Sequence, residues 1–170
     1  MSKKIRQEFA DQMLKLGSKD KSIVVLVGDI SHGILQPFAK KNQDRYYNIG
    51  ICEQSIVNMA AGLSKVGLNP VVHTIAPFIT ERAYEQIKLN VKGWAENKGK
   101  IIFINSGHNG CYTDAGRGHL IDDDIALCNA LNIETYTPTS RGGLIRYIKN
   151  KLKDKNGTSF IRLGWDNCEW

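Results

Sequence analysis

Short runs of apolar residues alternate along this chain with longer segments in which apolar side chains recur at helical spacing. The run SIVVLVG at residues 22–28 is almost continuously apolar, which is typical of a strand buried on both faces of a parallel sheet. Residues 3–16 instead place Ile5, Phe9 and Met13 on one side of a helix. The two patterns predict strands that alternate with helices from one end of the chain to the other.

The same reading assigns the remaining elements. Strands are predicted at residues 22–28, 46–49, 70–74, 100–105, 133–137 and 158–163. Helices are predicted at residues 3–16, 53–66, 79–95, 122–131 and 140–152, the last capped by Ser140, and residues 106–119 are predicted to form a loop. Such alternation is typical of the α/β class. We therefore expect one three-layer domain over residues 1–170, with a mainly parallel sheet of about six strands and helices on both faces.

Polar residues gather where the predicted strands end. In open α/β sheets, ligands bind beyond the carboxyl ends of the strands. The residues that fall at those ends are Asp29, Ile30, Ser31, Glu53, His73, Thr74, Phe78, Ser106, Gly107 and His108. Several unusual side chains thus converge on one edge of the sheet, and this edge is the predicted site. His73 fits a structural role there as well as a functional one.

Glu53 is the most informative residue of the chain. It opens an otherwise apolar helix, directly after a strand that ends in Gly50, within the stretch YYNIGICEQSIVNMAAGL. A carboxyl group is costly to bury without a partner, and burial favours its neutral form. A carboxyl that can share a proton with a ligand is one explanation. A glutamate held by the helix dipole and backbone is the other.

Composition narrows the choice of function. Hydrophobic content of 42% and charged content of 24% are ordinary for a globular protein, and the net charge of +6 is modest. No apolar run approaches the length of a membrane span, and the basic residues are not interleaved with aromatics as in a nucleic-acid surface. The four cysteines are spread without a CxxC pair: Cys52, Cys111, Cys128 and Cys168. We expect a cytoplasmic protein with reduced thiols and no zinc site.

Two other chemistries can be drawn from the sequence, and neither is well supported. Ser106, His108 and Asp114 could form a hydrolase triad, but the chain has no GxSxG motif. The carboxylates at residues 122–124 could cleave glycosides, although acidic residues at a helix start also complement the helix dipole. The chain also lacks a GxGxxG or P-loop motif, so we do not expect this domain to grip a nucleotide by itself.

Three segments together resemble a known family. YYNIGICEQSIVNMAAGLSKVG, PVVHTIAPFITERAYEQIKLNV and SGHNGCYTDAGRGHLIDDDIALCNAL are similar to the pyrimidine-binding domain of transketolase-type thiamine diphosphate enzymes. The resemblance runs from about residue 22 to residue 163. It implies the thiamine diphosphate-binding fold of the pyrimidine type, and it implies roles for individual residues.

The resemblance assigns the cofactor contacts as follows. Glu53 matches the glutamate that hydrogen-bonds the aminopyrimidine ring nitrogen, and Phe78 matches the aromatic residue that stacks on this ring. Asp29, with Ile30 beside it, falls where the family has an acidic residue near the cofactor. Arg82 belongs to the matching RAYEQ segment and supports either the site or a subunit interface.

The predicted loop at residues 106–119 implies the substrate contacts. His119 aligns with the histidine that ends the family's GEDGxTH loop, and His108 with an earlier histidine near the substrate. Imidazoles there can hydrogen-bond ketose hydroxyls and move protons. The sequence departs from the family at TDAGRGH, where Ala115 replaces an aspartate, Asp114 could partly substitute, and Arg117 adds a positive charge suited to an anionic substrate group.

The family resemblance also implies a missing half. The GDG…N motif that holds magnesium and the diphosphate in this family does not occur in the sequence, and the family's usual last domain is not expected after Trp170. We therefore expect a split enzyme in which a separate diphosphate-binding subunit completes the site, in a two-plus-two heterotetramer. The implied reaction is transfer of a two-carbon ketol unit between sugars or sugar phosphates. A decarboxylase of 2-oxo acids and a non-catalytic regulatory or assembly module remain as alternatives.

Overall fold

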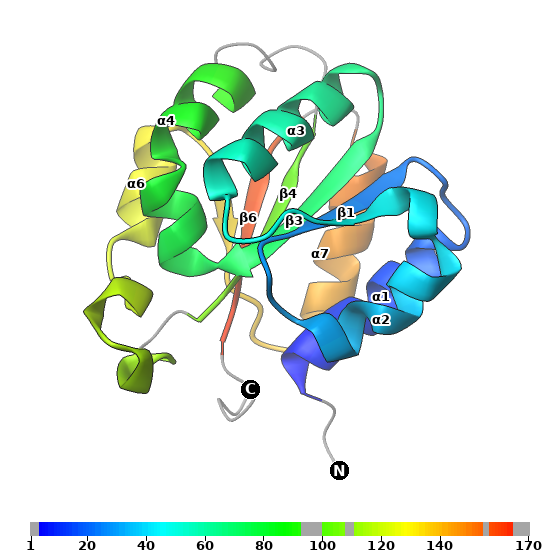
Figure 1. Cartoon of the computed structure of the whole chain (residues 1–170), viewed down its shortest axis with the longest axis horizontal. Helices are drawn as coiled ribbons and strands as arrows, with labels where there is room; N and C mark the ends of the chain where they lie inside the picture. The colour runs from blue at the N-terminus through cyan, green and yellow to red at the C-terminus, as the bar shows by residue number, and fades with distance from the viewer. Residues whose placement is uncertain (1–3, 93–99, 108–110, 155–156, 165–170) are drawn as a thin grey trace.

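Six parallel strands form one sheet in the computed structural model, which describes residues 4–92, 100–107, 111–154 and 157–164 (Figure 1). The strands lie in the order β2-β1-β3-β4-β6-β5. Their bounds are β1 Ile23–Val27, β2 Tyr46–Asn48, β3 Asn69–Ile75, β4 Ile102–Ser106, β5 Glu134–Tyr136 and β6 Ser159–Leu163. Every pairing is parallel, so the carboxyl ends of all six strands lie at the same edge. The predicted α/β fold with a parallel sheet is confirmed.

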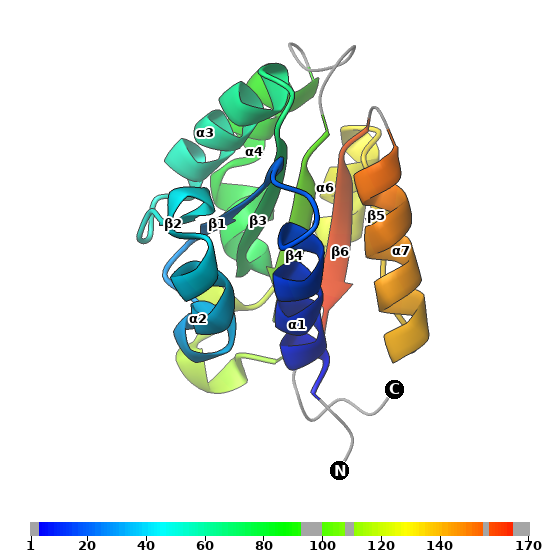
Figure 2. The same cartoon turned by 90° about the vertical axis from the view of Figure 1, so that its right-hand side faces the viewer.

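Helices cover both faces of this sheet (Figure 2). One face carries α1 Ile5–Gly17, α2 His32–Lys41 and α7 Arg141–Lys153. The other carries α3 Glu53–Lys65, η2 Phe78–Arg82, α4 Tyr84–Gln86, η3 Ile87–Lys92 and α6 Asp124–Ala130. Short 3₁₀ turns lie at η1 Gln43–Arg45, η4 Thr113–Ala115 and η5 Arg117–His119. Among the described helices, none is both long enough and apolar enough to cross a membrane.

Alternation along the strands builds two separate apolar cores. In β1, Val25 and Val27 pack in the core beneath α1, α2 and α7, while Val24 and Leu26 pack in the core beneath α3 and α6. Successive side chains of a strand point to opposite faces, so a strand between two helical layers must be apolar at every position. This explains why the run at residues 22–28 has no polar side chain after its first residue.

Two helical segments differ from the sequence-based prediction. Helix α2 was not predicted, because Pro37 lies inside it and a proline normally interrupts a helix. In a helix, a proline ring lies against the carbonyl group four residues earlier, which here is that of Gly33. The apolar face of this helix is buried through Leu35 and Phe38. The long helix predicted at residues 79–95 is instead a π-helical segment, a short α-helical turn and a second π-helical segment, with Ala83 outside helical geometry. The end of that prediction, residues 93–95, lies outside the described residues.

A row of polar side chains crosses the carboxyl end of the sheet on the α3 face. Thr74 at the end of β3 pairs in register with Asn105 of β4, which pairs with Arg162 of β6. By alternation these three side chains share the face of Phe103, which packs beneath α3 and α6. The sheet is thus polar in its last layer on the side where Glu53 begins α3.

Candidate active site

Glu53 is fully buried and makes two polar contacts. The Thr74 hydroxyl donates to its Oε1 at 3.2 Å, and Arg82 Nη1 donates to its Oε2 at 2.9 Å. A buried carboxylate requires such a partner, since an unpaired charge in the interior is strongly destabilising. Arg82 is the last residue of η2, so it reaches Glu53 from the neighbouring helical segment. The side chain of Arg82 is 38% exposed, so the group that covers Glu53 is itself in contact with solvent.

Gly28 closes the other side of this carboxyl group. A Cβ atom at residue 28 would lie 2.8 Å from Thr74 Oγ1 and 3.3 Å from Glu53 Oε1. Only a residue without a side chain fits at the end of β1 while the Thr74 hydroxyl reaches Glu53. The Oε1 side of the carboxyl group is therefore enclosed by protein, and the Oε2 side is the one that Arg82 covers.

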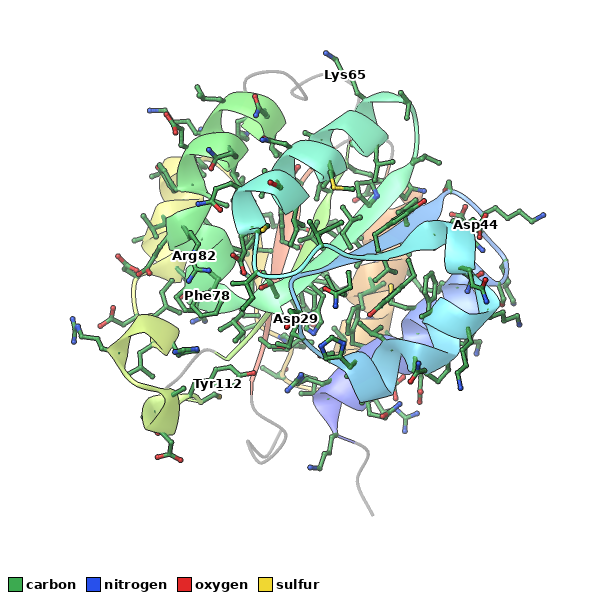
Figure 3. All side chains as sticks on the ribbon, viewed as in Figure 1. Asp29, Asp44, Lys65, Phe78, Arg82 and Tyr112 are labelled. Atoms are coloured by element: carbon green, nitrogen blue, oxygen red, sulfur yellow. The ribbon has the colours of Figure 1, made fainter. Side chains whose placement is uncertain are left out.

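Arg82 also lies over an aromatic ring. Its guanidinium carbon is 4.1 Å from the centroid of the Phe78 ring, which is cation–π geometry. On the same ring, His119 makes an edge contact with 5.0 Å between centroids, and Tyr112 lies 6.3 Å from His119. Figure 3 shows Arg82 and Phe78 beside each other, above the loop that carries Tyr112. Glu53, Arg82, Phe78 and His119 therefore form one continuous cluster, drawn from α3, η2 and the loop after β4.

Asn105 lies one strand away from Thr74 and is 1% exposed. Its side-chain amide finds no hydrogen-bond partner among the residues that the structure describes. Both strand neighbours are engaged elsewhere: Thr74 donates to Glu53, and Arg162 holds both oxygens of buried Asp124 at 2.7 and 3.1 Å. A buried amide without partners is costly, so a residue of this kind in a candidate site is informative.

On the opposite face, the end of β3 carries a second buried polar chain. Arg6 Nη2 donates to Ser31 Oγ at 2.6 Å, and His73 Nε2 lies 2.8 Å from the same oxygen. His73 Nδ1 lies 2.9 Å from the carbonyl oxygen of Ile104, which can only accept, so this nitrogen carries the proton and Ser31 donates to Nε2. Burial lowers the pKa of His73 to about 3, with a further lowering from the Arg6 charge and an opposing effect of the Ile104 hydrogen bond. These contacts suit a neutral ring and favour a structural role for His73.

The loop after β1 is held in an unusual backbone conformation. Asp29 and Ser31 have φ angles of 54° and 61°, which is the left-handed region that residues other than glycine rarely adopt. Asn48 spans this loop, since its side chain accepts from the Asp29 N–H and donates to the Asp29 carboxylate. The exposed Asp29 carboxylate also pairs with His32 at 3.1 Å. Asp29 and the half-buried Ile30 therefore lie at the same sheet edge as Glu53, without a hydrogen bond or ion pair to it among the described residues.

The predicted substrate residues lie on the loop after β4. Asp114 and Arg117 are exposed on the turns η4 and η5, and His119 is half-buried against Phe78. His108 lies outside the described residues. A pocket of about 420 Å³ opens between this loop and η2; it is lined by Glu81, Arg117, Gly118, Leu120, Ile121 and Asp122. Burial and the nearby carboxylates of Asp123 and Asp122 raise the pKa of Glu81, and Arg117 opposes this rise.

The sequence missed two residues that complete the site, Gly28 and Asn105, and the contact made by a third, Thr74. Gly28 has no side chain to attract notice, and Asn105 was read only as part of a strand. Thr74 was placed at the correct strand end, but nothing in the sequence indicates that its hydroxyl meets Glu53, 21 residues earlier. The alternation of β3 was the one available signal, because it places Thr74 on the opposite face from His73.

The chain matches the family described as transketolase, pyrimidine binding domain, over residues 2–164, and it belongs to this family. It is 31% identical over 164 residues to a protein of Methanocaldococcus jannaschii that is named as a transketolase C-terminal section, covering 95% of this chain and 50% of that protein. It is 35% identical over 119 residues to a protein of Actinobacillus succinogenes that is named as one subunit of an apulose-4-phosphate transketolase, covering 69% and 37% of the two chains.

Solved structures agree with this family. A split-gene transketolase, solved as an inactive β4 tetramer, matches 99% of this chain with a TM-score of 0.83 and 28% identity. A transketolase from Pichia stipitis shares the fold with a TM-score of 0.79 at 16% identity. The chain covers 53% and 26% of these two structures, and at most half of the relatives named above.

The cluster has the parts for handling a proton on a flat, nitrogen-containing ring. A carboxyl group enclosed by protein can exchange hydrogen bonds with a ligand in a setting where they are stronger than in water. Phe78 offers a face on which a ring can stack, now covered by the guanidinium. Nearby, His119 can donate or accept a proton at a group bound over Phe78.

Proposed function

We propose that this chain is the pyrimidine-binding subunit of a split, thiamine diphosphate-dependent transketolase-like enzyme. The observation that carries the proposal is the pairing of a fully buried carboxyl, Glu53, with the stackable ring of Phe78, in a chain of the transketolase pyrimidine family. The residues present fit an aminopyrimidine ring. The guanidinium of Arg82, a flat and cationic hydrogen-bonding group, already lies over Phe78 and donates to Glu53.

In the proposed mechanism, each described residue has a limited task. Glu53 would hold a proton at the nitrogen of a bound pyrimidine ring, and Thr74 and Gly28 fix its carboxyl group in place. Phe78 orients the ring by stacking. His119, in edge contact with Phe78, would move a proton to or from a substrate hydroxyl. Thiamine diphosphate, when bound, supplies an electron sink for the cleavage of a carbon–carbon bond next to a carbonyl group.

The rest of the cofactor site belongs to a second polypeptide in this proposal. The chain spans about half or less of its split relatives, and the names of those relatives describe a C-terminal section, a split gene and one subunit of a transketolase. We propose that a separate diphosphate-binding subunit supplies the magnesium and diphosphate ligands, and that the two subunits assemble as a heterotetramer. Among the described residues, Cys52 and Cys128 are free thiols, which supports a reducing, cytoplasmic location.

The proposed reaction is transfer of a two-carbon ketol unit between sugars or sugar phosphates. Asp114 and Arg117 would meet the substrate from the loop after β4, together with His108 and His119. The second candidate is a 2-oxo acid decarboxylating enzyme. Relatives named 1-deoxy-D-xylulose-5-phosphate synthase, one of them 31% identical over 158 residues, keep this candidate open because they show the domain outside transketolases.

The test is reconstitution with the partner subunit. The chain and a diphosphate-binding subunit encoded beside it would be co-expressed, and ketol transfer from ketose phosphates would be measured with thiamine diphosphate and magnesium. Glu53→Gln should fold but lower the rate by about 100-fold or more, the range expected when an acid–base group is lost.

Glu8→Gln is the matched control for that substitution. Glu8 is 1% exposed and ion-paired with Arg141, but it lies on α1, beneath the other face of the sheet. Its substitution should change stability without changing turnover. Near-normal turnover by Glu53→Gln, or equal losses in both variants, would refute the assigned role. Turnover of pyruvate-like acids in place of ketose phosphates would select the decarboxylating enzyme.

A further inference from the structure

Arg82 makes, within this chain, the two contacts that the proposed function assigns to the cofactor ring. Its guanidinium donates to Glu53 Oε2 at 2.9 Å and lies 4.1 Å from the centroid of Phe78. A guanidinium is planar, delocalised and rich in hydrogen-bond donors, and it stacks on aromatic faces. An aminopyrimidine ring shares the planarity and the hydrogen-bonding edge. The arginine therefore occupies the position of the ligand.

The two groups cannot occupy this position together. Oε1 of Glu53 faces Thr74 and the backbone of Gly28, where even one added carbon atom would lie 3.3 Å away. The open approach to the carboxyl group is on the Oε2 side, which Arg82 fills. In addition, a carboxylate in an ion pair only accepts hydrogen bonds, whereas a carboxyl group that donates to a ring nitrogen must keep a proton. Arg82 Nη1 already uses Oε2 as an acceptor, so this oxygen is engaged while the arginine is in place.

We propose that Arg82 fills the pyrimidine subsite of its own chain when no ligand is bound. In that state Arg82 shields Glu53, and its side chain must swing out before the cofactor ring enters. The inference rests on the proposed function and adds a competition within the chain itself. A ligand that binds only the open form has an apparent dissociation constant raised by the inverse of the open fraction. If about one chain in ten is open, the subsite binds about tenfold more weakly than its own contacts would allow.

The position of Arg82 in the fold suits such a movement. It is the last residue of the π-helical segment η2, and the next residue, Ala83, leaves helical geometry with φ −106° and ψ 16°. Irregular helical turns of this kind are often found at functional sites. The side chain is 38% exposed, so it can rotate toward solvent without disturbing the core, while Phe78 remains anchored between buried Pro77 and Ile79.

The test uses the full chain and a probe for this subsite alone, 4-amino-5-hydroxymethyl-2-methylpyrimidine, with binding measured by calorimetry. This probe carries the aminopyrimidine ring and no diphosphate, so it does not need the partner subunit. Arg82→Met removes the donors and the charge, and we expect it to bind the probe about tenfold more tightly than the natural chain. Arg82→Lys keeps the charge and loses the planar stack, and we expect a smaller, severalfold gain.

Arg141→Met is the matched control. Arg141 also covers a buried glutamate, Glu8, at 2.5 Å, and its side chain is 55% exposed, but it lies beneath the other face of the sheet. Both methionine variants lose an ion pair to a buried carboxylate and should lower the thermal midpoint, whereas only Arg82→Met should change probe binding. If Arg82→Met fails to fold, Arg82→Lys and the Arg82 Nε–H signal of the natural chain, followed by NMR as probe is added, decide the question.

The two possible failures are distinguishable. If the natural chain binds the probe and both Arg82 variants bind it equally or more weakly, Arg82 is a ligand of the cofactor rather than its competitor, and the inference is wrong. An Nε–H signal that is unchanged at saturating probe would overturn it in the same way. If neither the natural chain nor any variant binds the probe, the proposed function fails, and the inference with it.

Discussion

His73 provides the sharpest test of the structure, because its surroundings tie the stability of the protein to pH. The ring is fully buried, donates from Nδ1 to Ile104 and accepts at Nε2 from Ser31, which in turn accepts from Arg6. All of these contacts suit the neutral ring. A second proton on the ring would face a serine hydroxyl already bound to a guanidinium.

The size of the effect follows from the two pKa values. Burial lowers the pKa of His73 in the folded protein to about 3, from about 6.5 in an unfolded chain. The depressed folded-state pKa means that the contribution of this group to stability is complete above pH 6.5 and is lost as the pH falls toward 3. Each pH unit in that window costs about 1.4 kcal/mol, so this one side chain removes about 2 kcal/mol of stability between pH 6.5 and pH 5.

The assay is urea unfolding of the natural chain and of His73→Gln at pH 7.5 and at pH 5. Other groups titrate in this range, so the informative quantity is the difference between the two proteins. Glutamine does not titrate, and we expect the stability advantage of the natural chain to shrink by about 2 kcal/mol on going to pH 5. His32→Gln is the control, since the side chain of His32 is 61% exposed. Parallel loss of stability by the natural chain and His73→Gln would refute the reasoning.

Two further substitutions probe the site. Gly28→Ala places a carbon atom 2.8 Å from Thr74 Oγ1. It should lower the free energy of unfolding in urea by about 1–3 kcal/mol and should weaken aminopyrimidine binding. Unchanged stability and unchanged binding would contradict the close packing around Glu53. Asn105→Leu removes an unpaired buried amide and should raise the free energy of unfolding of the isolated chain by about 1 kcal/mol, whereas a loss of stability would show that the amide is satisfied in solution.

The sheet could be predicted from the sequence because its central strands are buried on both faces. β1 reads as a continuous apolar run, β4 begins with three apolar residues, and every predicted strand is present within a few residues. The order of the strands could not be read, since β6 enters between β4 and β5 through pairings that no local pattern encodes. A helix was harder to predict where its packing outweighs the local preference of a residue within it. In α2 the burial of Leu35 and Phe38 outweighs the proline within the helix.

The sequence offers candidate residues for the site but not the contacts between them. Glu53 stood out because a lone carboxyl at the start of an apolar helix demands a partner, and the structure supplies one in Arg82. That partner lies 29 residues later on another segment, so only the folded chain reveals the pair. The sequence left His73 open between two roles, and its contacts with Ser31, Ile104 and Phe9 favour the structural one.

Neighbouring residues at the end of β3 serve opposite sides of the sheet: His73 fastens α1 and the loop after β1, while Thr74 steadies Glu53. A single peptide unit therefore separates the residue that anchors the N-terminal helix from the residue that holds the buried carboxyl group of Glu53. A displacement of α1, by truncation or by a neighbour docking against it, would therefore act on the residue next to the one that holds Glu53. Engineering that loosens the first helix should for this reason be judged by its effect on ligand binding as well as on thermal resistance.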